Sequence, residues 1–184
     1  MQGILDHKLL VFGVLFAVGF VITCRALSYK FMFQITPSLP KGIYLISAPT
    51  YIESGTLVVF PIPQNVKALM QSRGWLLPRL KFYLMKPVVA KQGDSADVSE
   101  SGVFINGRFF GPVMQHDTQG LPLPKAYHKR TLQQGEYFVA TTYAKSFDSR
   151  YFGTIHQQDI KWVARPFLVL HGDLSQTSRK KDHP

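Results

Sequence analysis

The sequence predicts an all-β, or β-rich, domain preceded by one N-terminal transmembrane helix. Three observations predict this fold class. Short runs rich in Val, Ile, Phe, Tyr and Thr are separated by turn residues, which is the pattern of a β domain. An Asn-Gly pair lies between apolar residues at positions 103–110, and this pair is the strongest short-range signal for a β-hairpin. A single uncharged apolar run stands near the N-terminus.

The uncharged apolar run extends from Leu9 to Cys24. As an α-helix it would be about 24 Å long, slightly less than the ~30 Å hydrocarbon core of a bilayer. Snorkelling side chains or local bilayer thinning can make up this difference. A cleaved signal peptide is the main alternative, although Thr23-Cys24-Arg25-Ala26 offers no clean small-residue cleavage site. A buried core helix fits poorly because the run has no polar face. We expect residues 1–30 to be a cytoplasmic stub and membrane anchor, or else a signal segment.

Residues 31–174 are expected to form the working domain, and residues 175–184 a polar, basic and disordered tail. Turn residues such as Glu53-Ser54-Gly55 and Gly93-Asp94 separate the apolar runs of this domain. The only helical pattern covers Gln64–Arg73, and three prolines between Gly111 and Lys125 predict a loop. Besides the hairpin at 103–110, the predicted strands are Gly42–Ile46, Thr56–Phe60, Phe82–Ala90, Gly135–Thr141 and Ile160–Leu170.

The composition excludes several classes of protein. The chain of 184 residues is 46% hydrophobic, which argues against a disordered chain. Its one cysteine cannot form an internal disulfide, and no Cys/His cluster has zinc-finger spacing, so neither a metal nor a cofactor is predicted. The formal charge of +10 is compatible with nucleic acid, an anionic membrane or an acidic partner. Because no basic helix or RNA-binding aromatic stripe is present, we expect no nucleic-acid partner.

The first candidate site residue is Ser38, in the segment Pro37-Ser38-Leu39-Pro40 just beyond the apolar run. The two prolines hold the backbone extended and rigid around the hydroxyl. Such a segment is suited to presenting a nucleophile, and it is equally suited to a plain turn after an anchor.

The second candidate is Lys86, which interrupts the apolar strand 82–90. Alternation along a strand places Lys86 on one face with Leu84 and Val88. Burial there would lower the pKa of the amine and allow it to serve as a general base for a serine. The alternative is an edge-strand lysine that keeps its ammonium in water and prevents pairing with another strand.

The third candidate segment is Ser146-Phe147-Asp148-Ser149-Arg150-Tyr151-Phe152-Gly153. Asp148 and Arg150, two residues apart on an extended segment, can form an ion pair that braces a neighbouring structure. The alternative is a surface turn with an ordinary ion pair that contributes little.

In this order along the chain, the three segments resemble the S26 serine–lysine peptidases, the signal peptidase I group, and in particular the TraF-type peptidases of conjugative transfer. The resemblance spans roughly Leu9 to Val163 and also includes the Gly-Asp turn and the Val-x-x-Asn-Gly hairpin. Lys86 lies seven residues before Gly93 and eight before Asp94, as in the lysine motif of the family. The implied fold is an antiparallel β-sheet domain of the signal peptidase type.

The resemblance also implies a role for each candidate residue. It makes Ser38 the nucleophile and Lys86 its general base, with the Ser38 backbone N–H and the Thr36 hydroxyl as the oxyanion hole. It makes Ser146 the hydroxyl that orients the lysine amine. Asp148 and Arg150 correspond to residues that brace the site in the family, and in TraF-type members the aspartate also has a direct part in activity.

Two departures from the family pattern stand out. Met85-Lys86-Pro87 replaces the common Lys-Arg pair, and Ala140-Thr141-Thr142-Tyr143 stands where a Gly-Asp-Asn motif usually precedes the last box. Lys91 is a second candidate for the general base.

The resemblance implies a serine endopeptidase held in the bacterial inner membrane, with its catalytic domain on the periplasmic side. The expected partners are the lipid bilayer and an exported precursor, pilin-like, with small residues at the cleavage site. Cyclisation is chemically reasonable because an amine can replace water in resolving an acyl-enzyme. The alternatives are a general signal peptidase I and a non-catalytic periplasmic assembly subunit.

Overall fold

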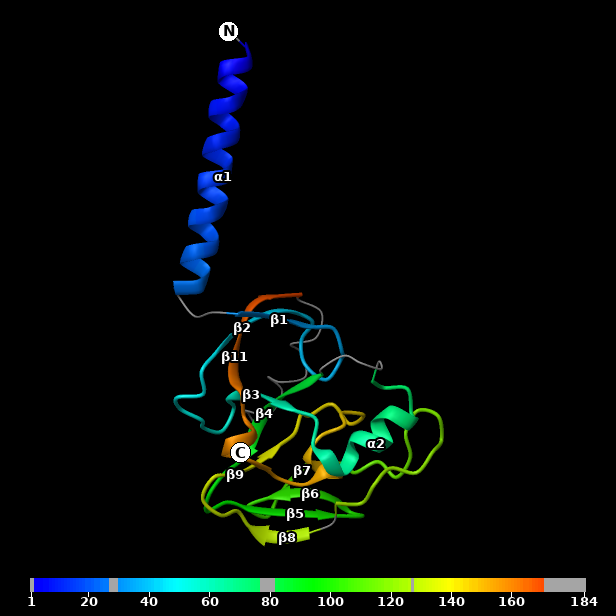
Figure 1. Cartoon of the computed structure of the whole chain (residues 1–184). Coiled ribbons are helices and arrows are strands. Elements are labelled where there is room, and N and C mark those ends of the chain that lie inside the picture. Colours follow the sequence, from blue (N-terminus) through cyan, green and yellow to red (C-terminus); the bar gives the residue numbers. More distant parts are fainter. Residues whose placement is uncertain (1, 27–29, 77–81, 127, 171–184) are drawn as a thin grey trace, which may run out of the picture.

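The computed structural model describes residues 2–26, 30–76, 82–126 and 128–170 (Figure 1). The predicted tail 175–184 lies outside the described residues. The β-rich character predicted from the sequence is confirmed, because the strands form two antiparallel sheets.

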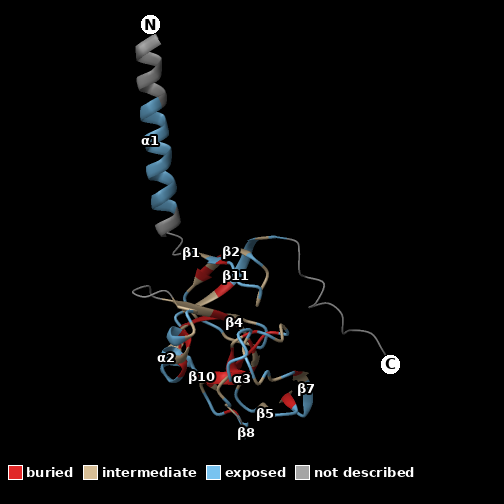
Figure 2. Cartoon of the chain, turned by 90° about the vertical axis from the view of Figure 1, so that its right-hand side faces the viewer, coloured by how far each residue is buried: buried red, intermediate tan, exposed pale blue. Residues whose placement is uncertain are grey.

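Helix α1, Gln2–Ala26, extends away from the β domain (Figure 1). Every residue of α1 from Leu10 to Thr23 is exposed, and Figure 2 shows this part of the helix in pale blue. Within the described part of the chain, no helix combines the length and apolar character required of a membrane span. The predicted anchor therefore stays a prediction.

The larger sheet has seven strands in the order β1-β2-β11-β3-β4-β9-β10, and every neighbouring pair is antiparallel. Strand β4 therefore lies in the interior of the sheet, between β3 and β9. The seven strands are β1 Lys30–Gln34, β2 Gly42–Ser47, β3 Leu57–Pro61, β4 Tyr83–Ala90, β9 Glu136–Val139, β10 Ile155–His156 and β11 Trp162–Val169.

The smaller sheet has four antiparallel strands in the order β7-β6-β5-β8. Its strands are β5 Ser95–Ser99, β6 Gly102–Ile105, β7 Arg108–Gly111 and β8 His128–Thr131. The predicted hairpin is β6–β7, in which Asn106 (φ 50°) and Gly107 (φ 75°) form a two-residue turn between the paired residues Ile105 and Arg108. Positive φ at both positions is what a type I′ turn requires, and Asn-Gly supplies it with little strain.

The hairpin turn is bound to the predicted Gly-Asp turn. Asn106 Nδ2 donates to Asp94 Oδ1 at 2.7 Å, and Asn106 Oδ1 accepts the Ser95 backbone N–H at 2.7 Å. Asp94 Oδ2 also accepts the Lys91 backbone N–H at 2.9 Å. Two motifs that are separate in the sequence therefore form one hydrogen-bonded unit.

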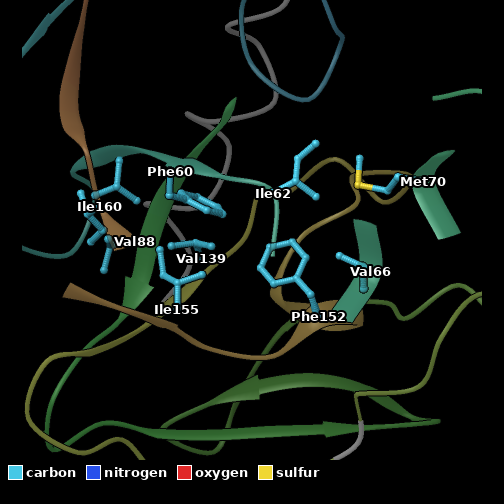
Figure 3. Packing of buried hydrophobic residues seen from close by; sticks show 10 residues of the cluster. Phe60, Ile62, Val66, Met70, Val88, Val139, Phe152, Ile155 and Ile160 are labelled. Atoms are coloured by element: carbon cyan, nitrogen blue, oxygen red, sulfur yellow. The ribbon is translucent and has the colours of Figure 1, made fainter. Parts of the chain in front are cut away.

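Helix α2, Gln64–Ser72, packs on the larger sheet, and the short helix α3, Ser149–Phe152, follows β9 in the chain, with the 3-10 turn Gln157–Asp159 after β10. Figure 2 shows the buried residues in the strands and in α3. The main core lies between β3, β4, β9, α2 and α3 (Figure 3), and consists of Val58, Phe60, Ile62, Val66, Met70, Val88, Val139, Phe152, Ile155 and Ile160.

The predicted strands at 42–46, 56–60, 82–90, 135–141 and 160–170 and the helix at 64–73 are present as β2, β3, β4, β9, β11 and α2, with small differences at their ends. The sequence did not predict β1, β5, β8, β10 or α3. Strand β8, His-Lys-Arg-Thr, is mostly exposed, and β5 buries only Ala96 and Val98. Such strands lack the apolar run on which the prediction depended.

We predict that Asn106→Ala lowers the free energy of unfolding by about 1–2 kcal/mol, because it removes two side-chain hydrogen bonds and places Cβ-bearing Ala at positive φ. Asn106→Gly keeps the conformational freedom and loses only the hydrogen bonds, so it should cost about half as much. Urea denaturation measures both. An equal loss in the two variants would contradict a contribution from the backbone conformation.

Candidate active site

The loop that carries Ser38 joins β1 to β2 and is held at both ends by hydrogen bonds. Gln34 Nε2, at the end of β1, donates to the Thr36 carbonyl at 2.9 Å and to Thr36 Oγ1 at 2.6 Å. Tyr44 Oη, within β2, donates to the Pro40 carbonyl at 2.8 Å. The two strands and the two prolines therefore fix the position of the half-buried Ser38.

Lys86 is the buried partner of this serine. It lies on β4 opposite Val58 of β3, its exposed fraction is 5%, and its Nζ donates a hydrogen bond to Ser38 Oγ at 2.8 Å. The edge-strand alternative is wrong, because β4 is paired on both sides. The distance is that of a good hydrogen bond between a base and a nucleophile.

Burial lowers the pKa of Lys86 from 10.5 to about 8. Desolvation of the ammonium is the largest cause; the carboxylate of Asp148 raises the pKa, and the guanidinium of Arg150 lowers it. At pH 7.5 about a quarter of such amines are neutral, against about one in a thousand at the ordinary pKa. The lysine is therefore able to accept a proton near neutral pH.

Thr36 lies beside Ser38, with 3.4 Å between the two hydroxyl oxygens. The Thr36 hydroxyl oxygen accepts a hydrogen bond from Gln34, which leaves its own proton available to an oxygen in the cleft. Ser146 is buried, with 2% exposure, and its Oγ makes no hydrogen bond of normal geometry within the described residues. The expected hydrogen bond from Ser146 to the Lys86 amine is thus not formed there.

Asp148 and Arg150 are completely buried, so the surface-turn alternative is wrong. Arg150 Nε lies 3.6 Å from Asp148 Oδ1. Asp148 caps α3 by accepting the Arg150 backbone N–H at 3.3 Å, and it accepts the Thr141 backbone N–H at 3.3 Å. Desolvation raises the pKa of the Asp148 carboxyl, while Arg150, Lys86 and the Ser146 hydroxyl lower it.

The guanidinium of Arg150 holds the segment that follows β9. It donates to the carbonyls of Thr141, Tyr143 at 3.2 Å and Ala144 at 3.4 Å, and it lies 5.9 Å from the centre of the Phe110 ring. The braced structure that the sequence left unspecified is therefore the stretch 141–144. A planar donor fork suits this task because it serves several carbonyls at once.

Ser38 opens into a cleft of about 850 Å³, a size typical of ligand sites. Five segments form its walls: the Ser38 loop, the turn at Ser54-Gly55, residues 87–89 of β4, the β6–β7 hairpin and residues 140–143. The lining residues are Pro37, Ser38, Leu39, Pro40, Ser54, Gly55, Pro87, Val88, Val89, Ile105, Asn106, Arg108, Phe109, Phe110, Ala140, Thr141, Thr142 and Tyr143.

Sequence reasoning missed the hairpin residues Arg108 and Phe109 as part of the site, together with the wall residues Thr141 to Tyr143. The available signals were the turn motif itself and the substitution of Ala-Thr-Thr-Tyr for the family motif. Lys91, the second candidate base, lies elsewhere in an ion pair with Glu53, which raises the pKa of its amine. Among the described residues, no group of three or more His, Cys, Asp or Glu side chains gathers for a metal ion.

An antiparallel β domain that holds a serine hydroxyl against a buried lysine amine has the architecture of a serine–lysine peptidase. The chain belongs to the signal peptidase family, peptidase S26, whose family model matches residues 5–169.

Similar proteins include plasmid and conjugal transfer proteins. A plasmid transfer protein TraF of Escherichia coli is 34% identical over 144 residues, which are 73% of this chain and 80% of that protein. A conjugal transfer protein TraF of Agrobacterium fabrum is 26% identical over 149 residues, 74% of this chain and 81% of that protein. A solved signal peptidase I from Enterococcus faecalis superposes with a TM-score of 0.36 at 20% identity, covering 62% of this chain and 96% of that one.

We predict that Lys86→Met stabilises the protein. The folded pKa of Lys86 is about 8 and the unfolded value is 10.5, so the unfolded chain holds this proton more tightly. The lysine therefore costs up to about 3 kcal/mol below pH 8, and this cost disappears as the pH rises from 8 to 10.5. Met should gain about 1–3 kcal/mol at pH 6 and progressively less above pH 8.

Urea denaturation at pH 6 and pH 9.5 measures this difference. Lys91→Met is the matched control, because Lys91 is paired at the surface and the free energy of unfolding should change little. A gain for Lys86→Met that is the same at both pH values would contradict a buried ammonium as its cause.

Proposed function

We propose that this protein is a membrane-anchored serine endopeptidase that uses Ser38 and Lys86 to cut an exported precursor protein. The observation that carries the proposal is the 2.8 Å hydrogen bond between the Ser38 hydroxyl and a lysine amine that burial brings to a pKa of about 8. A non-catalytic assembly subunit, the alternative expected to keep these two residues apart, is not supported by this distance.

The proposed reaction begins when the neutral Lys86 amine removes the proton from Ser38 Oγ as that oxygen attacks the scissile carbonyl carbon. The Ser38 backbone N–H and the Thr36 hydroxyl stabilise the oxyanion, and such donors contribute about 3–4 kcal/mol each. The Lys86 ammonium then gives its proton to the leaving amine, and the C–N bond breaks to leave an ester on Ser38. Lys86 next removes a proton from a water molecule as its oxygen attacks the ester carbonyl carbon. The bond from that carbon to Ser38 Oγ then breaks, Ser38 Oγ takes the proton back from the Lys86 ammonium, and the product leaves as a carboxylic acid.

Asp148 and Arg150 shift the pKa of Lys86 in opposite directions. The Asp148 carboxylate raises the pKa of Lys86 and so stabilises the ammonium formed during attack, while Arg150 opposes this effect. Arg150 in turn keeps the pKa of the Asp148 carboxyl from rising further, which favours its charged form.

The proposed substrate is an extended segment of a pilin-like precursor with small residues at the cut. The cleft around Ser38 is mostly apolar, with lining residues such as Leu39, Val88 and Phe110, which suits small residues at the scissile bond itself. The resemblance to proteins named for plasmid and conjugal transfer supports a precursor of the transfer apparatus. Resolution of the ester by the amine at the end of the same chain would join the product head to tail.

We place the catalytic domain against the periplasmic surface of the bacterial inner membrane. In Figure 1, β1, β2 and β11 lie at the end of the β domain nearest α1. The lipid-facing patch, as we name it, comprises large apolar side chains exposed on these strands and next to them: Phe31, Phe33, Ile35, Phe167, Leu168 and Leu170, with exposed fractions between 48% and 78%. Exposed apolar groups beside an apolar helix favour contact with lipid.

We predict that Ser38→Ala lowers kcat/KM for precursor cleavage at least about a thousandfold, because the variant cannot form the ester. Lys86→Met should lower it similarly although the protein stays folded. In the wild type, kcat/KM should rise about tenfold per pH unit below pH 8 and level off above it, as the lysine loses its proton.

Cleavage of a purified precursor by the full chain in detergent, followed by mass spectrometry, measures these values and separates linear from cyclic product. Ser72→Ala and Lys91→Met are the matched controls and should keep wild-type rates. Full activity in Ser38→Ala, or a pH profile already flat at pH 6, would overturn the Ser/Lys mechanism.

We predict that the lipid-facing patch touches the bilayer. In proteoliposomes of the full chain, a tryptophan introduced by Phe33→Trp should be quenched by brominated lipid. One introduced by Leu121→Trp, at another exposed apolar position, on the loop 111–125, should not be. Equal quenching of the two tryptophans, corrected for the native Trp75 and Trp162, would contradict the proposed orientation.

A further inference from the structure

The cleft has one charged residue in its walls. Among the described residues that line it, Arg108 is the only Asp, Glu, Lys or Arg, and the remainder are apolar, hydroxyl or amide side chains or glycine. A permanent cation at the wall of a largely apolar cleft is a strong determinant of what binds there.

The position of Arg108 is fixed by the hairpin. It is the first residue of β7, directly after the Asn106-Gly107 turn, and the turn is held against Asp94 and Ser95 by the hydrogen bonds described above. The exposed guanidinium therefore has a rigid base, although its long side chain can still reach into the cleft.

No carboxylate of the described residues neutralises Arg108. Glu53, which precedes the cleft residue Ser54, is paired with Lys91. Asp94, at the base of the hairpin, accepts hydrogen bonds from Asn106 and from the Lys91 backbone. The anion that Arg108 is suited to bind must therefore come from outside this part of the chain.

We propose that Arg108 is a specificity-determining residue that binds a carboxylate of the precursor peptide, so that the enzyme selects a segment with an acidic residue close to the cut. This inference rests on the proposed peptidase function. Arg108 hydrogen-bonds neither Ser38 nor Lys86, so it takes no part in bond breaking. The planar guanidinium accepts a carboxylate with two parallel hydrogen bonds, and the apolar walls strengthen the pairing.

A phosphate of the membrane is the less favoured anion. Arg108 belongs to the smaller sheet, which Figure 1 shows at the end of the β domain away from α1, β1 and β11. A bilayer that contacts the lipid-facing patch would therefore lie on the opposite side of the domain from the hairpin. A peptide that reaches Ser38 enters the same cleft as Arg108.

The test is a set of peptides based on the precursor cleavage site, each with one Asp placed at a successive position on either side of the cut, and a matched set with Asn. All are amidated at the C-terminus, so that the Asp side chain is the one carboxylate that varies. A free-acid version of the all-Asn peptide tests whether the terminal carboxylate serves instead. The full chain in detergent cleaves them, and kcat/KM is compared.

With the wild-type protein, we expect kcat/KM of the Asp peptide to exceed that of the matching Asn peptide by about tenfold or more at one position or at two adjacent positions. Arg108→Gln should remove this preference, and Arg108→Glu should reverse it, so that a Lys peptide becomes the better substrate. Arg165→Gln, an exposed arginine on β11 outside the cleft, is the control and should keep the preference.

Equal cleavage of Asp and Asn peptides at every position by the wild type would overturn this inference, as would a preference that survives in Arg108→Gln. Either result is compatible with the peptidase mechanism. If the wild type cleaves none of the peptides or the precursor, or if Ser38→Ala cleaves them equally well, the proposed function itself fails. Raising the salt concentration should weaken the Asp preference, because the pair is partly exposed to solvent.

Discussion

The burial of one lysine amine is the constraint on which the rest of the site depends. A buried ammonium is unfavourable unless it loses its proton or lies near an opposite charge, and both conditions apply to Lys86. The Asp148 carboxylate attracts the charged form, and the lowered pKa makes the neutral form accessible near pH 8. The burial of Lys86 on β4, a strand that lies between β3 and β9, is therefore what lowers the pKa of the base.

The buried ion pair connects this base to the shape of the cleft. Asp148 and Arg150 are joined to each other, to the N-terminus of α3 and to the carbonyls of the stretch 141–144. A change in either residue therefore acts on two properties at once, the pKa of Lys86 and the wall against which a substrate lies. Arg150 suits the position because its guanidinium donates to several main-chain carbonyls while its charge lies beside the Asp148 carboxylate.

The long apolar strands and the pair Ser38–Lys86 could be predicted from the sequence, but most residues that form the cleft around the pair could not. Strands such as β4 can be recognised in the sequence because a strand buried on both faces is a continuous run of apolar residues. The pairing of Ser38 with Lys86 was predicted from the resemblance to the S26 family, because no local sequence pattern predicts contact between residues that are 48 positions apart. Arg108 was missed because an exposed arginine beside a turn has no periodic signal. Its place in the cleft, as the one charged residue among the described lining residues, becomes apparent only in the folded structure.

The contacts of Arg150 also explain how this chain keeps a cleft wall without the Gly-Asp-Asn motif. Its guanidinium binds main-chain carbonyls, and Asp148 binds a main-chain N–H, so neither depends on the side chains at positions 141–144. Almost any residues that adopt the same backbone can be held in this way. The wall is therefore fixed in position while its side chains are free to vary, and the hairpin that carries Arg108 is likewise held through its turn. In this fold the candidate catalytic residues lie on the loop between β1 and β2, on β4 and at the N-terminus of α3, while the walls of the cleft are held by hydrogen bonds to the turn and to the backbone of 141–144.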